Sequence, residues 1–442
     1  MGITQWQPRE AQVTQGPGGR ILTNAAVWSP DSQWIVYDTR SDTEGSEFDG
    51  TSIERVHATT GEVRTVYTAR NGAHCGVATY HPALNRVLFI LGPENPTPDW
   101  QYGPSHRQGV WVEVDRPGVA RSLEARDLIP PFTPGALRGG SHVHMYSPDG
   151  ALVSFTYDDA LLPSTIQRNI GVSLVGVPIA VSKSHPRNHD GTAFSVLVTR
   201  TTADPAPGSD AIQRACEEGW VGTDGYRRED GTHQKRALAF QGMVRAPDGA
   251  PVCEVFIVDL PDDLTAADGN DLLEGTTILR PAPPSGTRQR RLTFTTGRRF
   301  PGICGPRHWL RSSPEGSRIA CLMRDESGYP QIWTVSPSGG LPAQVTHDPW
   351  GVASAFTWSP EGRFLAYAAD NSVFVVEVAS GQSHRLTPRT DLARAPLPLA
   401  CVFSPDNTKI AYLRRVPDSL SPTSDWRNQI FVIHLEPTAA ID

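Results

Sequence analysis

Histidines recur in one sequence context along this chain of 442 residues. Five of the thirteen stand in short polar or glycine-rich segments near a predicted strand: His74, His142, His144, His185 and His308. Imidazole binds divalent metals and acts as a general base at neutral pH. His142 and His144 alternate on a predicted strand and should point to one side, as two ligands of one metal would. A lone strand histidine is more often structural, but five in equivalent places favour a shared site.

Arginines accompany these histidines. Arg138 precedes the Gly139-Gly140 pair, and Arg187 and Arg307 lie within two residues of His185 and His308. The guanidinium group is suited to bidentate binding of a carboxylate. Because the whole chain carries a formal charge of −7, a basic site on it predicts an anionic ligand.

The elements that position these residues repeat along the chain. An aromatic-Ser-Pro-acid phrase, followed by an alternating apolar segment, recurs at residues 28–31, 146–149, 358–361 and 403–406, with partial copies at 80–82 and 313–316. Proline sets the backbone for a turn, the acidic side chain bonds to the turn backbone, and glycine accepts a positive φ. Each phrase therefore predicts a hairpin turn, and the spacing of about 45 residues fits a four-stranded propeller blade.

The phrases leave a gap between residues 185 and 300, which a seventh blade with an insertion near 201–236 would fill. Residues 209–218 in this insertion are the one helix-like stretch. The last blade lacks an outer strand after residues 429–434, and residues 11–14 match the closing-strand pattern without a blade of their own. We therefore expect residues 1–442 to form a single all-β, seven-bladed propeller that the N-terminal strand closes by completing the last blade.

In a propeller the innermost strands begin around one mouth of a central channel. The histidines precede or begin such strands in the predicted blades, so we expect their imidazoles to converge on one funnel.

Composition excludes some functions. An acidic chain is poorly suited to nucleic acid, which requires a basic surface. No run of 18 apolar residues predicts a membrane span, and the first residues lack the order of a signal peptide, so a cytoplasmic location is expected. The six cysteines are scattered, which indicates reduced thiols.

Residues 72–94, 141–150 and 184–192 resemble blades of the oligogalacturonate lyases. This resemblance implies a propeller that cleaves uronic-acid oligosaccharides by β-elimination with a histidine-bound divalent metal, typically manganese. It also implies a catalytic role for His74. Where the lyases carry a Gln-x-x-His-x-His run, this chain has Pro306-Arg307-His308-Trp309, so one ligand of three remains.

The whole chain more closely resembles an uncharacterised bacterial propeller family, through residues 139–144 and 289–294. Its repeats also resemble those of the TolB propellers. Both resemblances imply the fold and leave the reaction open.

The leading hypothesis is a lyase acting on an anionic oligosaccharide. Its metal would be held by His142, His144 and His308, its base would be His74 or His185, and its substrate would be bound by Arg138, Arg187 and Arg307. The alternative is a non-catalytic TolB-like propeller that binds a protein or glycan. A glycoside hydrolase would need two facing carboxylates, for which the candidates are Asp158, Asp159, Glu217 and Glu218.

Overall fold

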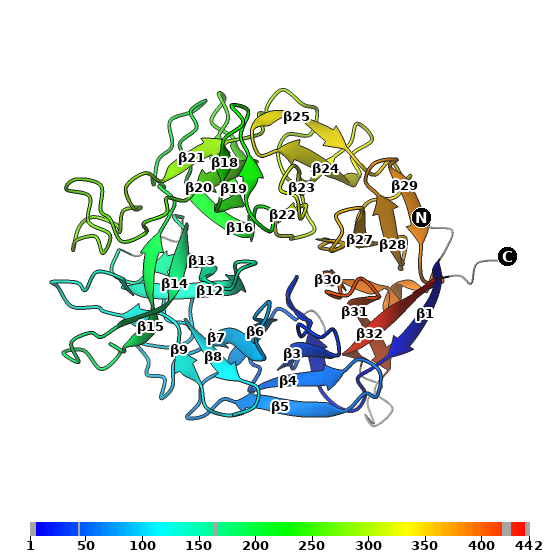
Figure 1. Ribbon diagram of the computed structural model, residues 1–442, viewed down its shortest axis with the longest axis horizontal. Helices are drawn as coiled ribbons and strands as arrows, with labels where there is room; N and C mark the ends of the chain where they lie inside the picture. The colour runs from blue at the N-terminus through cyan, green and yellow to red at the C-terminus, as the bar shows by residue number, and fades with distance from the viewer. Residues whose placement is uncertain (1–5, 43–44, 163–165, 418–425, 438–442) are drawn as a thin grey trace.

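The computed structural model describes residues 6–42, 45–162, 166–417 and 426–437. Seven four-stranded antiparallel sheets follow one another around a central axis (Figure 1). The chain is therefore a seven-bladed β-propeller, as the repeat predicts. Among the described residues the one helical element is the 3-10 turn η2 (Leu392–Arg394). No helix in this part of the chain is long and apolar enough to cross a membrane.

The strands of each blade run from the axis outward, and the first strand of a blade lies nearest the centre in Figure 1. Blades 1 to 3 consist of β2 (Gly19–Ile21), β3 (Trp34–Arg40), β4 (Ser52–His57) and β5 (Val63–Thr68); β6 (Cys75–Tyr80), β7 (Arg86–Leu91), β8 (Gln108–Glu113) and β9 (Arg121–Ser122); and β12 (Gly139–Tyr146), β13 (Leu152–Asp159), β14 (Asn169–Ile179) and β15 (Gly191–Leu197). The short β10 (Ala125–Arg126) and β11 (Ala136–Leu137) pair in parallel between blades 2 and 3.

Blades 4 to 7 consist of β16 (Arg214–Trp220), β19 (Ala237–Arg245), β20 (Pro251–Asp259) and β21 (Arg288–Arg291); β22 (Arg311–Ser312), β23 (Ile319–Arg324), β24 (Pro330–Ser336) and β25 (Gly339–Gln344); β26 (Thr357–Trp358), β27 (Phe364–Ala369), β28 (Ser372–Glu377) and β29 (Gln382–Arg385); and β30 (Pro396–Phe403), β31 (Lys409–Pro417), β32 (Trp426–Pro437) and β1 (Trp6–Gln12).

The Ser-Pro-acid phrase forms the predicted turn between the two inner strands of a blade. In blade 3 the Ser147 hydroxyl donates to Asp149 Oδ1 at 2.5 Å and accepts from the Leu152 amide at 2.9 Å. The same serine–aspartate bond recurs between Ser404 and Asp406 in blade 7, at 2.6 Å. The phrase therefore closes each hairpin with side-chain bonds that do not depend on the neighbouring blade.

The N-terminal strand closes the ring. β1 pairs antiparallel with β32, with Ala11 opposite Val432 and Gln12 opposite Phe431. Apolar side chains then fill the junction between the last and first blades, where Val27 and Ile35 pack with Leu413. The prediction of this closure is confirmed.

The prediction of a helix-like stretch at residues 209–218 is wrong. Arg214–Trp220 form β16, the innermost strand of blade 4, and Ala215 lies opposite Gly242 of β19. Pairing within the sheet overrides the local preference for a helix. A small hairpin follows, made of β17 (Tyr226–Arg227) and β18 (His233–Gln234).

Candidate functional site

Residues from five blades line one cavity of about 460 Å³ at the end of the ring where the innermost strands begin. We call it the central cavity. Its polar lining comes from β3, from the loop between β7 and β8, from β12 and from the segment before β22: Asp38, Arg40, Tyr102, Arg107, His142 and Arg307. Of the predicted site residues, His142 and Arg307 line this cavity.

The Gly139-Gly140 pair allows the β7–β8 loop to reach this cavity. A Cβ at Gly140 would clash with the Pro104 carbonyl of that loop, and a Cβ at Gly139 would clash with the Asp158 carbonyl of β13. Gly140 therefore lets the loop pack directly on the start of β12, and Gly139 lets β12 lie close to β13. This packing brings Arg107 to the same cavity as His142.

A β-bulge separates His142 from His144. The register of β12 on β13 shifts between His142 and Met145, and Val143 has a φ of 53°. Such a bulge ends the simple alternation of side chains along a strand. His142 lines the central cavity, whereas the buried His144 places Nε2 2.8 Å from Glu124 Oε1 between blades 2 and 3. The expectation that both imidazoles share one side is therefore wrong.

His142 offers a free imidazole to the cavity. The side chain is half-buried, and its ring nitrogens make no hydrogen bond with any residue that the structure describes. Burial, followed by repulsion from Arg107, Arg307 and Arg168, lowers the pKa of His142 well below 6.5. The ring is therefore neutral at pH 7 and can accept a proton.

Arg107 is the buried cation of this cavity. Its side chain is 7% exposed, with Nη2 3.7 Å from Asp158 Oδ2 and Nη1 3.4 Å from the Tyr102 hydroxyl. Arg168 binds the same carboxylate more closely, with Nη2 3.1 Å from Asp158 Oδ2. Two guanidinium groups thus share one carboxylate, which leaves positive charge beside His142.

Arg307 is the exposed cation. Its Nε donates to Glu217 Oε1 at 2.8 Å, and its guanidinium lies 4.6 Å from the centre of the Trp309 ring. More than half of the Arg307 side chain is exposed, so it can also reach a ligand in the cavity. Arg40, by contrast, is held by the buried Asp38 at 2.6 Å and by backbone carbonyls, which makes it part of the wall.

His308 is a structural residue. Its Nδ1 lies 2.9 Å from the Pro306 carbonyl, and its Nε2 accepts from the Leu322 amide at 3.0 Å. Both nitrogens are thus occupied within the protein, and burial lowers the pKa of the ring to about 4.

The predicted metal ligands do not converge. His142 faces the central cavity, His144 pairs with Glu124, and His308 bonds to its own blade. Across the described ranges no group of three or more His, Cys, Asp or Glu side chains is arranged to hold a metal ion. The donor set therefore does not fit the manganese site that the lyase resemblance implies.

The other predicted site residues lie away from the central cavity. His74 precedes β6 with Nδ1 3.0 Å from the Asp49 carbonyl. His185 lies in the loop between β14 and β15, in the outer half of blade 3, and not at the start of an innermost strand as its sequence context suggested. Arg187, in the same loop, donates to the Glu94 and Asn95 carbonyls at 2.7 and 2.9 Å.

Arg138 is a buried residue that links two parts of the chain. Its Nε lies 3.0 Å from Asp159 Oδ2, and its Nη groups donate to the carbonyls of Thr276 and Leu279. It ties blade 3 to the long connection between β20 and β21, so its contacts are structural.

The carboxylates that a glycoside hydrolase would need are engaged elsewhere. Asp158, Asp159 and Glu217 form ion pairs with Arg168, Arg138 and Arg307, and the buried Glu218 accepts from the Thr156 hydroxyl at 3.0 Å. None of the four lines the central cavity.

Sequence reasoning missed Arg107 and Tyr102, which stand in the 16-residue connection between β7 and β8. A connection of this length in a propeller is itself a signal, because long loops in compact domains are often functional.

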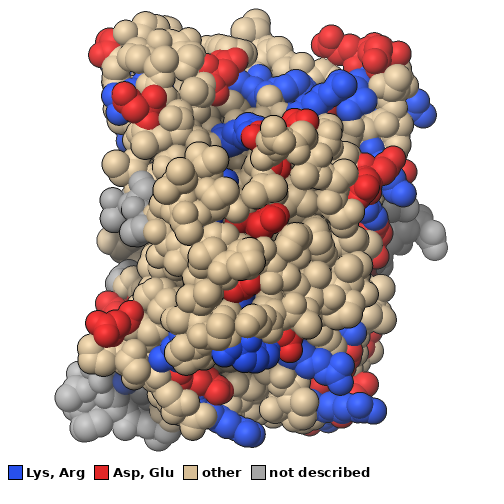
Figure 2. Space-filling view, turned by 90° about the vertical axis from the view of Figure 1, so that its left-hand side faces the viewer, with Lys and Arg blue, Asp and Glu red and all other residues tan. Residues whose placement is uncertain are grey.

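The side of the ring that Figure 2 shows carries both positive and negative side chains. Basic and acidic side chains are interspersed over the face shown, and no continuous basic surface covers it. On this face, positive charge is therefore not gathered as nucleic-acid binding would require.

Comparison with known proteins agrees with the fold. Residues 74–189 match the family described as a protein of unknown function (DUF3748). The chain is 46% identical over 409 residues to the Uncharacterized protein YidR of Escherichia coli (strain K12), a match that covers 91% of this chain and 94% of that protein.

Among solved structures, an oligogalacturonate lyase in complex with manganese superposes with a TM-score of 0.56 at 11% identity, covering 97% of this chain and 96% of that one. A putative TolB from Agrobacterium tumefaciens matches with a TM-score of 0.37 at 14% identity over 98% and 99% of the two chains. At such identities the lyase superposition shows a common fold alone.

Proposed function

The chain belongs to the family of the Escherichia coli protein YidR, and we propose that this propeller acts as a lyase on a uronic-acid oligosaccharide bound in the central cavity. One observation carries the proposal: His142 presents a neutral imidazole, with no hydrogen-bond partner among the described residues, beside Arg107 and Arg307. A base next to cations is what elimination from a carboxylate-bearing sugar requires. The charges of the cavity support an anionic substrate, and the resemblance to the lyases supports the choice of a uronic acid.

The reaction removes a weakly acidic proton from the carbon that bears the carboxylate. Arg107 and Arg307 neutralise that carboxylate and so stabilise the negative charge that develops when the proton leaves. His142 takes the proton, the freed electron pair forms the carbon–carbon double bond, and the bond to the glycosidic oxygen at the neighbouring carbon breaks. The Tyr102 hydroxyl, which lines the same cavity, can supply the proton that this leaving oxygen needs.

Incubation with a panel of oligouronides tests the proposal. The expected result is a rise in the ultraviolet absorbance of the unsaturated product, together with binding measured by calorimetry. Binding without product would favour the alternative of a non-catalytic glycan-binding propeller. The absence of both binding and product across the whole panel would contradict the proposal.

Removal of metal is expected to leave the activity unchanged. The three predicted ligands face different surroundings, so treatment with EDTA followed by desalting should not alter product formation in the absorbance assay. Addition of Mn²⁺ to the treated protein is the control. A loss of activity that Mn²⁺ restores would show that a metal acts through residues other than these three.

The rate should be insensitive to pH around neutrality. Because the pKa of His142 lies well below 6.5, the imidazole stays neutral from pH 7 down to pH 6.5, and the rate of product formation should fall only at lower pH, where the ring gains a proton. Initial rates in buffers of constant ionic strength measure this. A fall in rate centred near or above pH 6.5 would show that the base is a different group or that ligand binding raises its pKa.

A further inference from the structure

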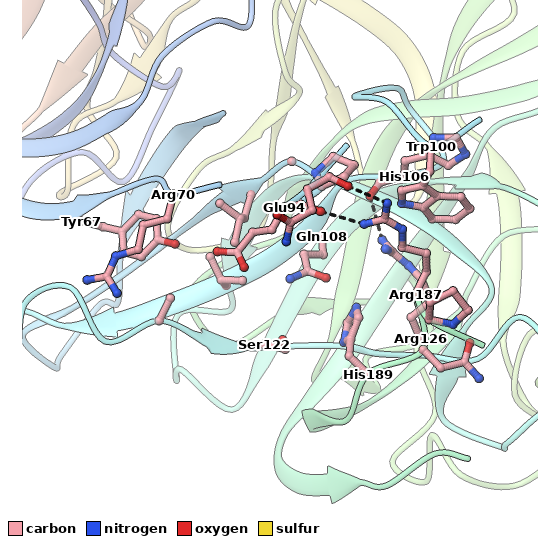
Figure 3. Close-up of a pocket in the computed structure, with 18 of the residues that line it drawn as sticks. Tyr67, Arg70, Glu94, Trp100, His106, Gln108, Ser122, Arg126, Arg187 and His189 are labelled. Atoms are coloured by element: carbon pink, nitrogen blue, oxygen red, sulfur yellow. Dashed lines mark hydrogen bonds between the residues drawn. The ribbon is translucent and has the colours of Figure 1, made fainter. Parts of the chain in front are cut away.

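A second cavity, of about 690 Å³, is lined by residues of blades 1, 2 and 3 (Figure 3). We call it the outer cavity. Trp100, His106, Arg126, Arg187 and His189 gather at one end of it, and Tyr67 and Arg70 lie at the other. The β7–β8 loop separates it from the central cavity: Trp100 and His106 line the outer cavity, whereas Tyr102 and Arg107 line the central one.

Arg126 is a buried charge without a counter-ion. Only 5% of the residue is exposed, and no carboxylate of the described residues forms an ion pair with it. Its Nε donates to the Gly139 carbonyl at 3.3 Å, and its Nη2 donates to the His106 and Arg107 carbonyls at 3.2 and 2.7 Å. Its Nη1 donates to no residue in the ranges that the structure describes. The nearby Glu124 is engaged by His144 and by the Gly109 amide.

A guanidinium ion removed from water is costly unless an anion accompanies it. Carbonyl bonds orient Arg126 and satisfy part of its donors, but they do not neutralise its charge. Burial accordingly lowers the pKa of Arg126 to about 10. An anion entering the cavity would supply the missing charge.

Arg187 adds a second cation without a carboxylate partner among the described residues. Its Nη groups bind the Glu94 and Asn95 carbonyls, and its guanidinium lies 5.9 Å from the centre of the Trp100 ring, with that of Arg126 at 5.6 Å. Two guanidinium groups therefore lie near one aromatic ring at the same end of the cavity (Figure 3).

The same end also offers acceptors for hydroxyl groups. His189 places Nδ1 3.2 Å from the Asp190 carbonyl, which leaves Nε2 as an acceptor, and within the described part of the chain this buried nitrogen has no partner. His106 likewise binds the Gln101 carbonyl through Nδ1 at 2.8 Å. Neutral imidazole acceptors next to cations suit a ligand that carries both an anionic group and hydroxyl groups.

We infer that the outer cavity is a second binding site, for a small hydroxylated anion whose carboxylate or phosphate pairs with Arg126 and Arg187 and whose hydroxyl groups donate to His189 and His106. This inference is independent of the proposed lyase reaction.

Calorimetric titration with D-galacturonate and with D-glucose 6-phosphate tests the inference and separates the two anion types, with neutral D-galactose as the control. At least one anion should bind the full chain, and D-galactose should not. Arg126→Gln and Arg187→Gln should each weaken binding at least tenfold. Arg64→Gln, on β5 and outside the lining of both cavities, should leave this binding unchanged.

Arg187→Gln keeps the test decisive if Arg126→Gln fails to fold, because Arg187 is only half-buried. Arg126→Lys should fold and bind the anion more weakly than the unsubstituted protein. Lysine keeps the positive charge but lacks the planar guanidinium group, which presents several N–H donors at once. The inference is overturned if neither anion binds, if binding survives in the arginine variants of the outer cavity, or if Arg64→Gln removes it equally.

Discussion

Replacement of His142 by glutamine should lower the rate of unsaturated product formation about 10²- to 10⁴-fold, the range expected for loss of a general base. Glutamine keeps the approximate size and a polar group but cannot accept the proton at neutral pH. Because Arg107 and Arg307 still face the cavity, substrate affinity measured by calorimetry should change little. The predicted signature is therefore a fall in kcat with nearly constant binding.

A matched control is available in His233→Gln, on the exposed hairpin of β17 and β18. This variant should retain the full rate. If His142→Gln also retained it, His142 would not be the base, and the elimination mechanism would need another residue. If His142→Gln lost binding as well as rate, the imidazole would hold the substrate instead.

Replacement of Glu124 by alanine should lower the free energy of unfolding by about 1–3 kcal/mol for each buried polar group that loses its hydrogen-bond partner. Glu124 is 2% exposed, accepts from the Gly109 amide at 2.9 Å and lies 2.8 Å from His144. Without the carboxylate, the Gly109 amide and the His144 ring lose their partner between blades 2 and 3. Denaturant unfolding followed by circular dichroism measures the effect.

Glu62→Ala provides the comparison, because Glu62 and its partner Arg64 are both half-exposed on the outer strands of blade 1. A surface pair of this kind contributes little to stability, because solvent screens it. Equal effects of the two substitutions would show that the Glu124–His144 contact does not hold the blades together.

The fold was predictable because its signals are local. A Ser-Pro-acid phrase specifies its own turn through bonds such as that between Ser147 and Asp149. Each copy can therefore be recognised in the sequence without knowledge of the neighbouring blades. The closing strand could be predicted for a related reason. The last blade lacks an outer strand and the N-terminal strand belongs to no other blade, so the two are expected to pair. Local preference failed at Arg214–Trp220, where pairing with β19 decides the structure.

The site was less predictable because it depends on where a strand departs from regular geometry and on the path of a long loop. Regular alternation of side chains along β12 would place His142 and His144 on one side of the sheet. The bulge at Val143 places them on different sides instead. The letters around His308 resemble a ligand segment, yet only the packed structure shows that Pro306 and Leu322 occupy both of its nitrogens. Arg107 reaches the cavity through a long loop, whose path no repeat specifies.

The pairing of β1 with β32 also has a consequence for biosynthesis. Val432 is synthesised long after Ala11, so the ribosome must complete the six intervening blades and most of the seventh before the two can meet. Until then β1 has an unsatisfied edge, and such edges invite pairing with other chains. Nascent molecules that stall late should therefore be more prone to aggregate than finished ones, even though six of their seven sheets can already form.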